Sequence, residues 1–403
     1  MTPLRTIAVV GASLAGLRAV ETLRRDGYEG QIVWVGAESQ LPYDRPPLSK
    51  EVLRGDWEAE RTALRKQGFE ELVLDLRLGC RALALDPGAR SLELEGGERI
   101  RYDGLVIATG ARPRSLAGTP DLEGIHLLRT LDDSLAIRRE LEKNPRVLVV
   151  GAGFIGAEVA ASCRMRGPEV TVVEPLPVPM LRGLGAAMGE VCAELHRSHG
   201  VDLRCGLSVE VFEGAHRIER VRLSDGSVLD ADLVVVGIGV TPETGWLASS
   251  GLALEDGVVC DATCATRAPD VVAAGDVARW YNPLFDESMR VEHWTNAAEQ
   301  GVAAAKRLLA GPAAAEPFAP VPLFWSDQYD LKIQFAGRMR PDDELRVVHG
   351  SLEERRFVAL YGREGRLVGA LAFNRPRQLM RYRQLIGART SWSDELAQAA
   401  KPG

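Results

Sequence analysis

The sequence lacks any pair of cysteines spaced to hold a metal ion or to form a redox dithiol. No two of its six cysteines form a C-x-x-C pair, the spacing used by zinc ribbons and dithiol redox centres. The closest two, Cys260 and Cys264, have no histidine or further cysteine nearby to complete a set of ligands. We therefore expect no metal site, and reduced, mostly buried thiols at every cysteine: Cys80, Cys163, Cys192, Cys205, Cys260 and Cys264.

Long apolar runs and an excess of positive charge are also missing. No run approaches the roughly 18 apolar residues that a membrane-spanning helix needs. The 49 Lys and Arg against 56 Asp and Glu give a net charge of −7, which disfavours nucleic-acid binding. A strand-like run begins at Thr6, so we expect no signal peptide and a cytoplasmic protein without membrane or nucleic-acid partners. A length of 403 residues predicts two or three domains.

One pattern occurs twice. A strand-like run over 6–10 leads into Gly11-Ala12-Ser13-Leu14-Ala15-Gly16, then a helical stretch, then a second strand-like run that reaches Glu38. About 140 residues later, a run over 146–150 leads into Gly151-Ala152-Gly153-Phe154-Ile155-Gly156, a helical stretch and a run that ends at Glu174. These two β-α-β motifs predict two dinucleotide-binding sites in an α/β fold.

Each position in the motif has a physical reason. The first glycine makes a tight turn, the second lets the backbone approach a pyrophosphate, and the third lets the helix pack on the strand. The helix N-terminus then faces the phosphates, and the terminal acid accepts hydrogen bonds from ribose hydroxyls. Ser13 stands in place of the second glycine of the first motif, where we expect a slightly shifted site or a hydroxyl that donates to phosphate.

The acid of the second motif indicates which coenzyme binds there. Glu174 is followed by 175–179, Pro-Leu-Pro-Val-Pro, with no Lys or Arg before Arg182. A carboxylate at this place should repel a 2′-phosphate. The sequence therefore predicts a preference for NADH over NADPH.

Three more apolar runs end in residues suited to a cofactor edge. The run over 105–108 ends in Thr109-Gly110, and the run over 233–236 leads to Gly237 and Gly239; each of these two ends either faces a cofactor or is a simple chain reversal. The run over 271–274 ends in Gly275-Asp276, which places one carboxylate at the C-terminal edge of a sheet, where cofactors bind.

In this order, the motifs resemble those of two-dinucleotide flavoprotein reductases with the glutathione reductase fold. Three further stretches narrow the resemblance to the NADH:ferredoxin reductases: LPYDRPPLSK at 41–50, VEHWTNA at 291–297 and FWSDQY at 324–329. The resemblance covers about residues 5–390. It implies an α/β fold with two Rossmann-like dinucleotide-binding domains and a C-terminal α+β domain. FAD would lie on 1–112 with 243–320 and NADH on 113–242, and an Ala-, Gly- and Pro-rich stretch would lead into a C-terminal domain at 321–403.

The implied activity is electron transfer from NADH through FAD to a ferredoxin, a small iron–sulfur protein that feeds an oxygenase. That oxygenase is either a haem-thiolate monooxygenase or a ring-hydroxylating dioxygenase. Relatives that reduce disulfides or peroxides carry a reactive cysteine after the first β-α-β motif, and this sequence has none between Glu38 and Cys80. Two alternatives remain, an NADH oxidase and a signalling flavoprotein like apoptosis-inducing factor. The resemblance allows a monomer or a weak homodimer.

The resemblance also assigns site residues. Lys50 and Glu158 are the candidate catalytic residues, with Lys50 reaching the flavin or pairing with Glu158. Glu38 would hold the adenosine ribose, Asp276 would bond a ribityl or pyrophosphate group, and two tryptophans, Trp294 and Trp325, would line the flavin. Further residues in or near the FAD site are Gly11, Ser13, Leu14, Ala15, Gly16, Arg45, Leu83, Thr109, Gly110, Arg129, Glu292 and His293. On the NADH side the residues are Gly151, Gly153, Ile155, Gly156, Glu174, Arg182 and Gly239.

A basic stretch marks a candidate docking surface. Residues 375–389 contain five arginines and no acid, and residues 321–403 hold 14 Lys and Arg against 10 Asp and Glu, or +4. That leaves −11 for residues 1–320, since the whole chain carries −7. Ferredoxins are usually acidic, so this stretch would steer one toward the flavin; the alternative is an ordinary solvated helix face. The candidate docking residues are Arg375, Arg377, Arg381 and Arg383.

Overall fold

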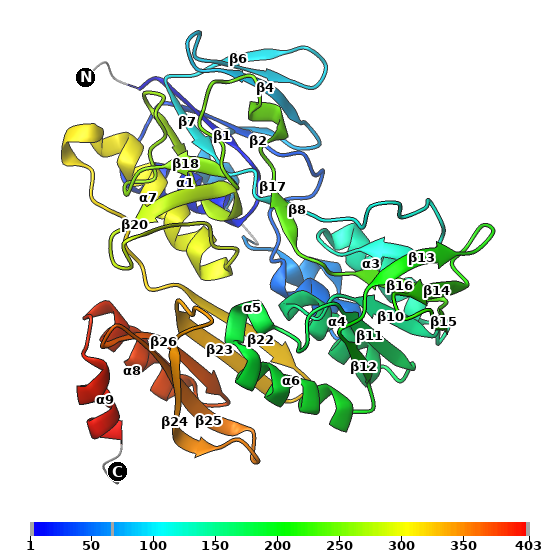
Figure 1. The fold of residues 1–403 in the computed structure, drawn as a ribbon. Coiled ribbons are helices and arrows are strands. Elements are labelled where there is room, and N and C mark those ends of the chain that lie inside the picture. Colours follow the sequence, from blue (N-terminus) through cyan, green and yellow to red (C-terminus); the bar gives the residue numbers. More distant parts are fainter. Residues whose placement is uncertain (1–3, 66–67, 400–403) are drawn as a thin grey trace. The chain divides into compact units, whose positions relative to one another are not determined.

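The computed structural model describes residues 4–65 and 68–399, and the chain divides into two compact units (Figure 1). Each unit is assembled from three segments of the chain. Unit 1 comprises Met1–Asp44, Thr62–Arg112 and Thr241–Pro322, and unit 2 comprises Arg45–Arg61, Pro113–Val240 and Leu323–Gly403. The segment Arg45–Arg61 therefore belongs to unit 2, although the chain on either side of it belongs to unit 1.

Unit 1 is built on a parallel sheet with strand order β19-β7-β1-β2-β3. Helix α1 (Leu14–Arg25) follows β1 directly and packs against α7 (Trp294–Ala310). Four of the strands, β19, β7, β1 and β2, are mainly apolar on both faces, which is typical of a parallel sheet covered on both sides, whereas the edge strand β3 alternates Leu with Asp75 and Arg77. Their bounds are β1 (Thr6–Val10), β2 (Gln31–Val35), β3 (Leu74–Arg77), β7 (Gly104–Ile107) and β19 (Val271–Ala273).

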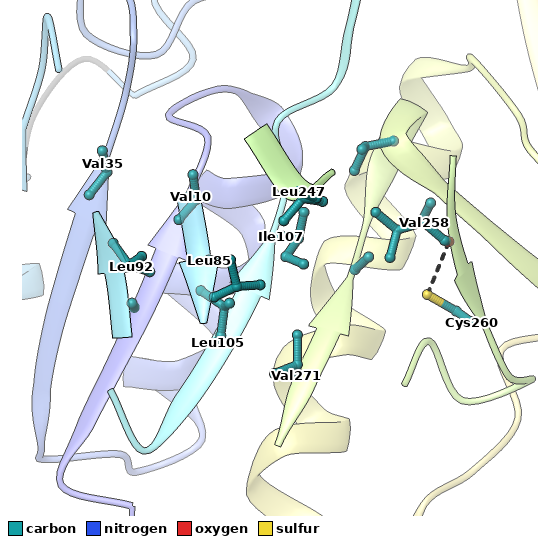
Figure 2. Packing of buried hydrophobic residues seen from close by; sticks show 14 of the residues in the cluster. Val10, Val35, Leu85, Leu92, Leu105, Ile107, Leu247, Val258, Cys260 and Val271 are labelled. Carbon is teal, nitrogen blue, oxygen red and sulfur yellow. Dashed lines mark hydrogen bonds between the residues drawn. The ribbon is translucent and has the colours of Figure 1, made fainter. Parts of the chain in front are cut away.

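A small antiparallel sheet covers one face of the parallel sheet of unit 1. Leu85 and Leu92 of the small sheet pack with Val10, Leu105 and Ile107 of the parallel sheet, as Figure 2 shows. The small antiparallel sheet contains β4 (Ala82–Asp86), β5 (Ser91–Leu94) and β6 (Arg99–Arg101). A second small sheet, with mixed strand directions, contains β18 (Val258–Cys260), β20 (Ala278–Asn282) and β21 (Glu287–Met289). Short 3-10 turns complete unit 1: η3 (Glu70–Leu72), η4 (Gly245–Leu247), η5 (Gly275–Val277) and η6 (Pro312–Ala314).

Unit 2 contains a second parallel sheet, with strand order β12-β11-β10-β16-β9. Its helix α3 (Leu131–Leu141) begins with a capping box in which the Thr130 hydroxyl and the Asp133 carboxylate satisfy each other's backbone N–H. The strands are β9 (Ile125–Leu127), β10 (Val147–Val150), β11 (Val170–Glu174), β12 (Asp202–Cys205) and β16 (Leu233–Val236). The helices are α2 (Glu51–Arg54), α4 (Phe154–Met165), α5 (Leu181–Leu184) and α6 (Ala186–Ser198), with the turn η1 (Pro46–Ser49) before α2.

An antiparallel sheet forms the C-terminal part of unit 2, and its core is continuous with helix α6. Met188, Cys192 and Leu195 of α6 share one buried cluster with Ile333 and Phe357 of this sheet. The strand order is β22 (Leu323–Gln328), β23 (Leu331–Gly337), β26 (Arg366–Phe373), β25 (Arg356–Arg363) and β24 (Glu344–Ser351), followed in the chain by α8 (Pro376–Gly387) and α9 (Trp392–Ala399). A small sheet of β13 (Val209–Glu213), β14 (Arg220–Leu223) and β15 (Val228–Asp230) completes the unit.

The chain crosses between the units five times, after residues 44, 61, 112, 240 and 322. Three of these crossings lie in the turn η2 (Ala59–Thr62) and in the strands β8 (Ala111–Pro113) and β17 (Val240–Pro242), and these two strands pair with each other. The predicted α/β fold with two parallel sheets and a C-terminal α+β part is confirmed, while the assignment of cofactors to these segments stays a prediction.

All six cysteines are free thiols. Burial raises the pKa of Cys163, Cys192 and Cys264 to about 12, so these thiols are not thiolate nucleophiles. Within 4–65 and 68–399, no group of three metal-ligating side chains comes together. The same residues include no helix with the length and apolarity needed to cross a bilayer.

Candidate active site

The first glycine turn, in unit 1, requires glycine at both of its ends. Gly11 has a φ of +117°, and a Cβ there would lie 2.1 Å from the carbonyl oxygen of Ala108. A Cβ on Gly16 would lie 2.0 Å from the oxygen of Gly11. Ser13 is the N-cap of α1, but its hydroxyl makes no capping hydrogen bond. The turn therefore leaves both a helix N-terminus and a hydroxyl suited to binding phosphate.

The second glycine turn, in unit 2, repeats this geometry with a true glycine in the middle. Gly151 has a φ of +98°, and a Cβ on Gly156 would lie 2.0 Å from the Gly151 oxygen. Nothing lies within 4 Å of the Cβ position of Gly153, the N-cap of α4, so there is room for a phosphate beside the backbone. Both turns fit the pyrophosphate of a dinucleotide.

Glu174 is held at the second turn by backbone groups. Its carboxylate accepts hydrogen bonds from the N–H of Ala152 at 2.6 Å and from the N–H of Leu176 at 2.9 Å. The side chain is buried, so its position is fixed next to the glycine turn. A ribose bound there would meet a preoriented carboxylate, and a phosphate on that ribose would meet negative charge.

In unit 1, the turn that carries Asp276 packs against the first turn of α1 through Gly275. The adjoining Gly275 has a φ of +78°, and its Cβ position is 3.1 Å from the Cβ of Ala15. Its N–H donates to Gln300 of α7 at 2.9 Å, which fixes the turn after β19. Gly275, the residue before Asp276, thus packs against the first glycine motif, and the role of Asp276 at a cofactor stays a prediction.

Two of the sequence stretches that carry the resemblance meet in unit 1. The indole N–H of Trp294, the first residue of α7, donates to the carboxylate of Asp44 at 2.6 Å. Just after the end of β7, the Thr109 hydroxyl donates to the carbonyl of Glu243 at 2.8 Å. Glu38 accepts a short hydrogen bond from the Tyr43 hydroxyl.

The Lys50–Glu158 pair lies within unit 2. Lys50 Nζ is 2.8 Å from Glu158 Oε2, and the two side chains are only 5% and 3% exposed. The same carboxylate accepts from the Ser49 hydroxyl at 2.5 Å and from the Ser326 hydroxyl at 2.8 Å. A buried ion pair is maintained only when such hydrogen bonds satisfy its remaining lone pairs. The Glu158 carboxylate therefore accepts hydrogen bonds from three donors: one ammonium group and two hydroxyls.

Hydrogen bonds to backbone carbonyls hold the loop that carries Lys50. The Ser162 hydroxyl on α4 donates to the carbonyl of Ser49 at 2.7 Å, and the Ser134 hydroxyl on α3 donates to the carbonyl of Leu48 at 2.7 Å. Arg45, at the start of this segment, donates to the carbonyl of Arg129 at 2.7 Å, which joins two predicted FAD-site residues. These bonds explain why the segment belongs to unit 2.

The remaining predicted residues are distributed over both units. Leu83 on β4 and Ile155 on α4 are each 50% exposed, and Arg182 on α5 is also exposed. Trp325 is half-buried on β22, and Glu292 forms an ion pair with Arg290 at 2.7 Å. The N-cap of α7 is His293, and the exposed turn after β16 contains Gly239 with a φ of +97°. Lys50 and Glu158, the candidate catalytic residues, thus lie together in unit 2, and the first glycine motif and Asp276 lie together in unit 1.

The sequence did not predict the two serines whose hydroxyls donate hydrogen bonds to the Glu158 carboxylate. Ser49 and Ser326 sit inside the stretches PPLSK and FWSDQY, next to the predicted Lys50 and Trp325. The available signal was a polar residue directly next to a charged one within the motifs that carry the resemblance. Asp44, the partner of Trp294, was missed in the same way.

The basic stretch is less uniform than the sequence suggested. Arg381 on α8 forms an ion pair at 3.2 Å with Glu395 on α9, whose side chain is fully buried. Arg375 donates to the carbonyl of Arg356, and Arg383 is half-buried. Arg377 is exposed. The acid that compensates this stretch comes from outside it.

Comparison with known proteins gives a consistent result along the chain. Residues 5–301 match the family described as pyridine nucleotide-disulphide oxidoreductase, and residues 323–402 match the reductase C-terminal domain. Rhodocoxin reductase of Rhodococcus erythropolis is 36% identical, with 97% of this chain and 92% of the relative covered. The ferredoxin--NAD(+) reductase component of the biphenyl dioxygenase system of Paraburkholderia xenovorans is 38% identical, with 98% and 96% covered.

Solved structures agree with the sequence relatives. The reductase in a covalent putidaredoxin reductase–putidaredoxin complex superposes with a TM-score of 0.92 at 32% identity, with 99% of each chain covered. A ferredoxin reductase from Rhodopseudomonas palustris also gives a TM-score of 0.92, at 35% identity, with 98% of this chain and 100% of that chain covered.

Proposed function

This chain belongs to the pyridine nucleotide-disulphide oxidoreductase family and carries the reductase C-terminal domain, and we propose that it is an NADH-dependent ferredoxin reductase. Its cofactors are FAD and NADH. Relatives of nearly the same length are named as reductase components of the anthranilate and biphenyl dioxygenase systems, and others as rhodocoxin and putidaredoxin reductases. The electron acceptor is then a small iron–sulfur protein that feeds an oxygenase.

Different residues of the chain bind the two cofactors and hold the charge of Lys50 in place. Bound FAD supplies an acceptor for hydride and a donor of single electrons. The N-termini of α1 and α4 bind the two pyrophosphates, and Glu38 and Glu174 orient the adenosine riboses. Lys50 holds a positive charge in a buried position, where a fixed charge acts much more strongly than in water. Glu158 holds that ammonium group in place through the ion pair at 2.8 Å.

The main support for this proposal is the composition of the stretch after the first β-α-β motif, which holds a buried lysine and no cysteine. Residues 39–79 contain no cysteine, and Lys50 in that stretch is buried against Glu158. A disulfide or peroxide reductase would need a reactive sulfur beside the flavin. Electrons must therefore leave the flavin directly for an external carrier.

The test is anaerobic stopped-flow reduction with NADH, followed by mixing with an acidic ferredoxin and cytochrome c. We expect fast bleaching of the flavin and cytochrome reduction that depends on the ferredoxin. Bleaching without carrier-dependent transfer, together with rapid turnover on oxygen, would instead favour an NADH oxidase. Bleaching without either transfer would favour a signalling flavoprotein, and no bleaching would contradict the second nucleotide site.

Glu174 supports the preference for NADH. A phosphate charge about 4 Å from a carboxylate, at an effective dielectric constant of about 20, is disfavoured by about 4 kcal/mol for each unit charge. We expect kcat/KM to be at least about 100-fold higher for NADH than for NADPH, and Glu174→Ala to reduce this ratio. Comparable kcat/KM for the two coenzymes in the unmodified protein would contradict the assignment.

We propose that an acidic ferredoxin docks on the arginines of α8. Charge reversal of Arg377, Arg381 and Arg383 to Glu should slow ferredoxin reduction and leave ferricyanide reduction unchanged, because ferricyanide needs no docking surface. The matched control is Arg99→Glu, a reversal on β6 at a side chain that is 73% exposed. Equal slowing with both acceptors would contradict the docking surface.

Three further expectations concern the cofactor-binding domains, the cellular location and the oligomeric state. FAD occupies 1–112 with 243–320, NADH occupies 113–242, and the protein functions in the cytoplasm as a monomer or weak homodimer. Light scattering across a range of concentrations tests the oligomeric state. A concentration-independent dimer or larger assembly would contradict it.

A further inference from the structure

A continuous line of hydrogen bonds, buried except at its far end at Tyr329, leads away from Glu158 through unit 2. The Ser326 hydroxyl donates to Glu158 Oε1 at 2.8 Å, and Gln328 Nε2 donates to the Ser326 oxygen at 3.0 Å. Next, Gln328 Oε1 lies 3.1 Å from His196 Nε2, and His196 Nδ1 lies 3.0 Å from the Tyr329 hydroxyl. Ser326 and Gln328 are completely buried and His196 is 2% exposed. The line joins β22 of the C-terminal part to α6 and to the candidate catalytic pair.

The direction of every bond in this line follows from its first member. Glu158, paired with Lys50, is a carboxylate and can only accept, so the single hydroxyl proton of Ser326 points to it. The Ser326 oxygen then has to accept, which orients the amide NH2 of Gln328 toward it. The amide oxygen of Gln328 therefore faces His196.

The orientation of Gln328 in turn sets the tautomer of His196. An amide oxygen accepts, so His196 must carry its proton on Nε2. Burial lowers the pKa of His196 to about 4, so near neutral pH the ring has only this one proton, and its Nδ1 accepts from the Tyr329 hydroxyl. All donors in the line thus point toward Glu158.

We propose that Ser326, Gln328 and His196 are positioning residues that hold the Glu158 carboxylate, and through it Lys50, in the geometry used for hydride transfer. This inference rests on the proposed function, because it assigns the C-terminal part a role in the reductive half of that reaction. The line does not conduct protons, since the neutral amide of Gln328 would have to give up a proton in order to relay one. Its effect is electrostatic and geometric, as chains of aligned hydrogen bonds polarise one another.

The first test is the protonation pattern of two histidines in the holoenzyme, which requires no turnover. His199 Nδ1 is 2.8 Å from the carbonyl oxygen of Leu195, and a carbonyl can only accept, so His199 must carry a proton on Nδ1. Nitrogen-15 NMR of the imidazoles should therefore show His196 as the neutral Nε2–H form and His199 with a protonated Nδ1. A neutral Nδ1–H form of His196 would overturn the proposed line of bonds.

The second test is a double-mutant cycle on flavin reduction at saturating NADH. Ser326→Ala should lower the limiting rate constant about tenfold and change the apparent Kd for NADH less than twofold. Ser326→Thr, which retains a hydroxyl, should restore most of the rate. In a Glu158→Gln background, the further change Ser326→Ala should alter the rate less than twofold, because its effect passes through the carboxylate.

The control is Ser198→Ala, which removes an exposed hydroxyl that donates within its own helix turn to Leu195. It should leave the limiting rate unchanged. An equal tenfold loss from Ser326→Ala with and without Glu158 would show a general structural effect and overturn the positioning role. Failure of the unmodified protein to be reduced by NADH would instead refute the proposed function, while the histidine tautomers would still report on the line of bonds.

Discussion

Replacement of Lys50 by Met tests the buried ion pair most directly. Methionine matches the length of the lysine stem but removes the ammonium group, so Glu158 loses its 2.8 Å partner. The Ser49 and Ser326 hydroxyls remain as donors to the carboxylate. The change therefore separates the charge of the pair from its packing.

The expected loss of stability can be worked out from burial. Removing one partner of a buried pair costs about 3–5 kcal/mol, because the other charge is left uncompensated. The two remaining hydroxyls and the apolar methionine offset part of this, so we expect Lys50→Met to lower the free energy of unfolding by about 3 kcal/mol. A second change, Glu158→Gln, removes the orphaned charge and should recover most of that loss.

The rate of hydride transfer should behave differently from stability. Loss of a preorganised charge at a reacting site costs about 100-fold in rate, and Glu158→Gln cannot restore it. Urea unfolding of the two variants measures the first effect, and anaerobic stopped-flow reduction with NADH measures the second. If Lys50→Met reduces its flavin as fast as the unmodified protein, the catalytic role of Lys50 is wrong.

Three further predictions follow from the geometry. Gly156→Ala should destabilise the fold by about 1–3 kcal/mol and abolish NADH binding, because its Cβ would lie 2.0 Å from a carbonyl oxygen of the turn. Gly153→Ala should fold normally, because the space at its Cβ position is open, and should only weaken the affinity for NADH. Titration with NADH measures both affinities. The low pKa of His196, about 4 against about 6.5 unfolded, means that the unfolded chain binds more protons between these values, so stability falls as pH falls. Between pH 7 and pH 5, unfolding in urea should show a loss about 2 kcal/mol smaller in His196→Gln than in the unmodified protein; equal losses would contradict the buried neutral ring. Arg381→Glu should lower the unfolding midpoint by more than Arg377→Glu, because only Arg381 compensates the buried Glu395.

The elements that could be predicted from the sequence are those fixed by short-range rules. A strand that runs into Gly11 or Gly151 must turn sharply, since both residues adopt a positive φ that side chains disfavour. The acid that ends the second strand of the second motif then falls beside that turn, and Glu174 is bonded there. Local pattern and chain length were sufficient for both motifs.

The features that could not be predicted depend on contacts between distant segments. Nothing in the sequence near Lys50 indicates that 45–61 packs with 113–240 instead of its chain neighbours. That packing depends on hydroxyls from two helices, Ser134 and Ser162, that reach backbone carbonyls. The net charge of a stretch likewise does not show that Glu395, on a different helix, neutralises Arg381.

The membership of residues 45–61 in unit 2 has a consequence for recombination among relatives. Lys50 and Glu158 are 108 positions apart in sequence but lie in one compact unit, so motion between the units leaves their pairing unchanged. A chimera cut at contiguous boundaries, such as an exchange of 113–242 alone, would combine Lys50 from one parent with Glu158 from another. Exchanges that preserve the pair must move 45–61 and 113–240 together, and exchanges that also keep the Ser326 donor of Glu158 must include 323–403.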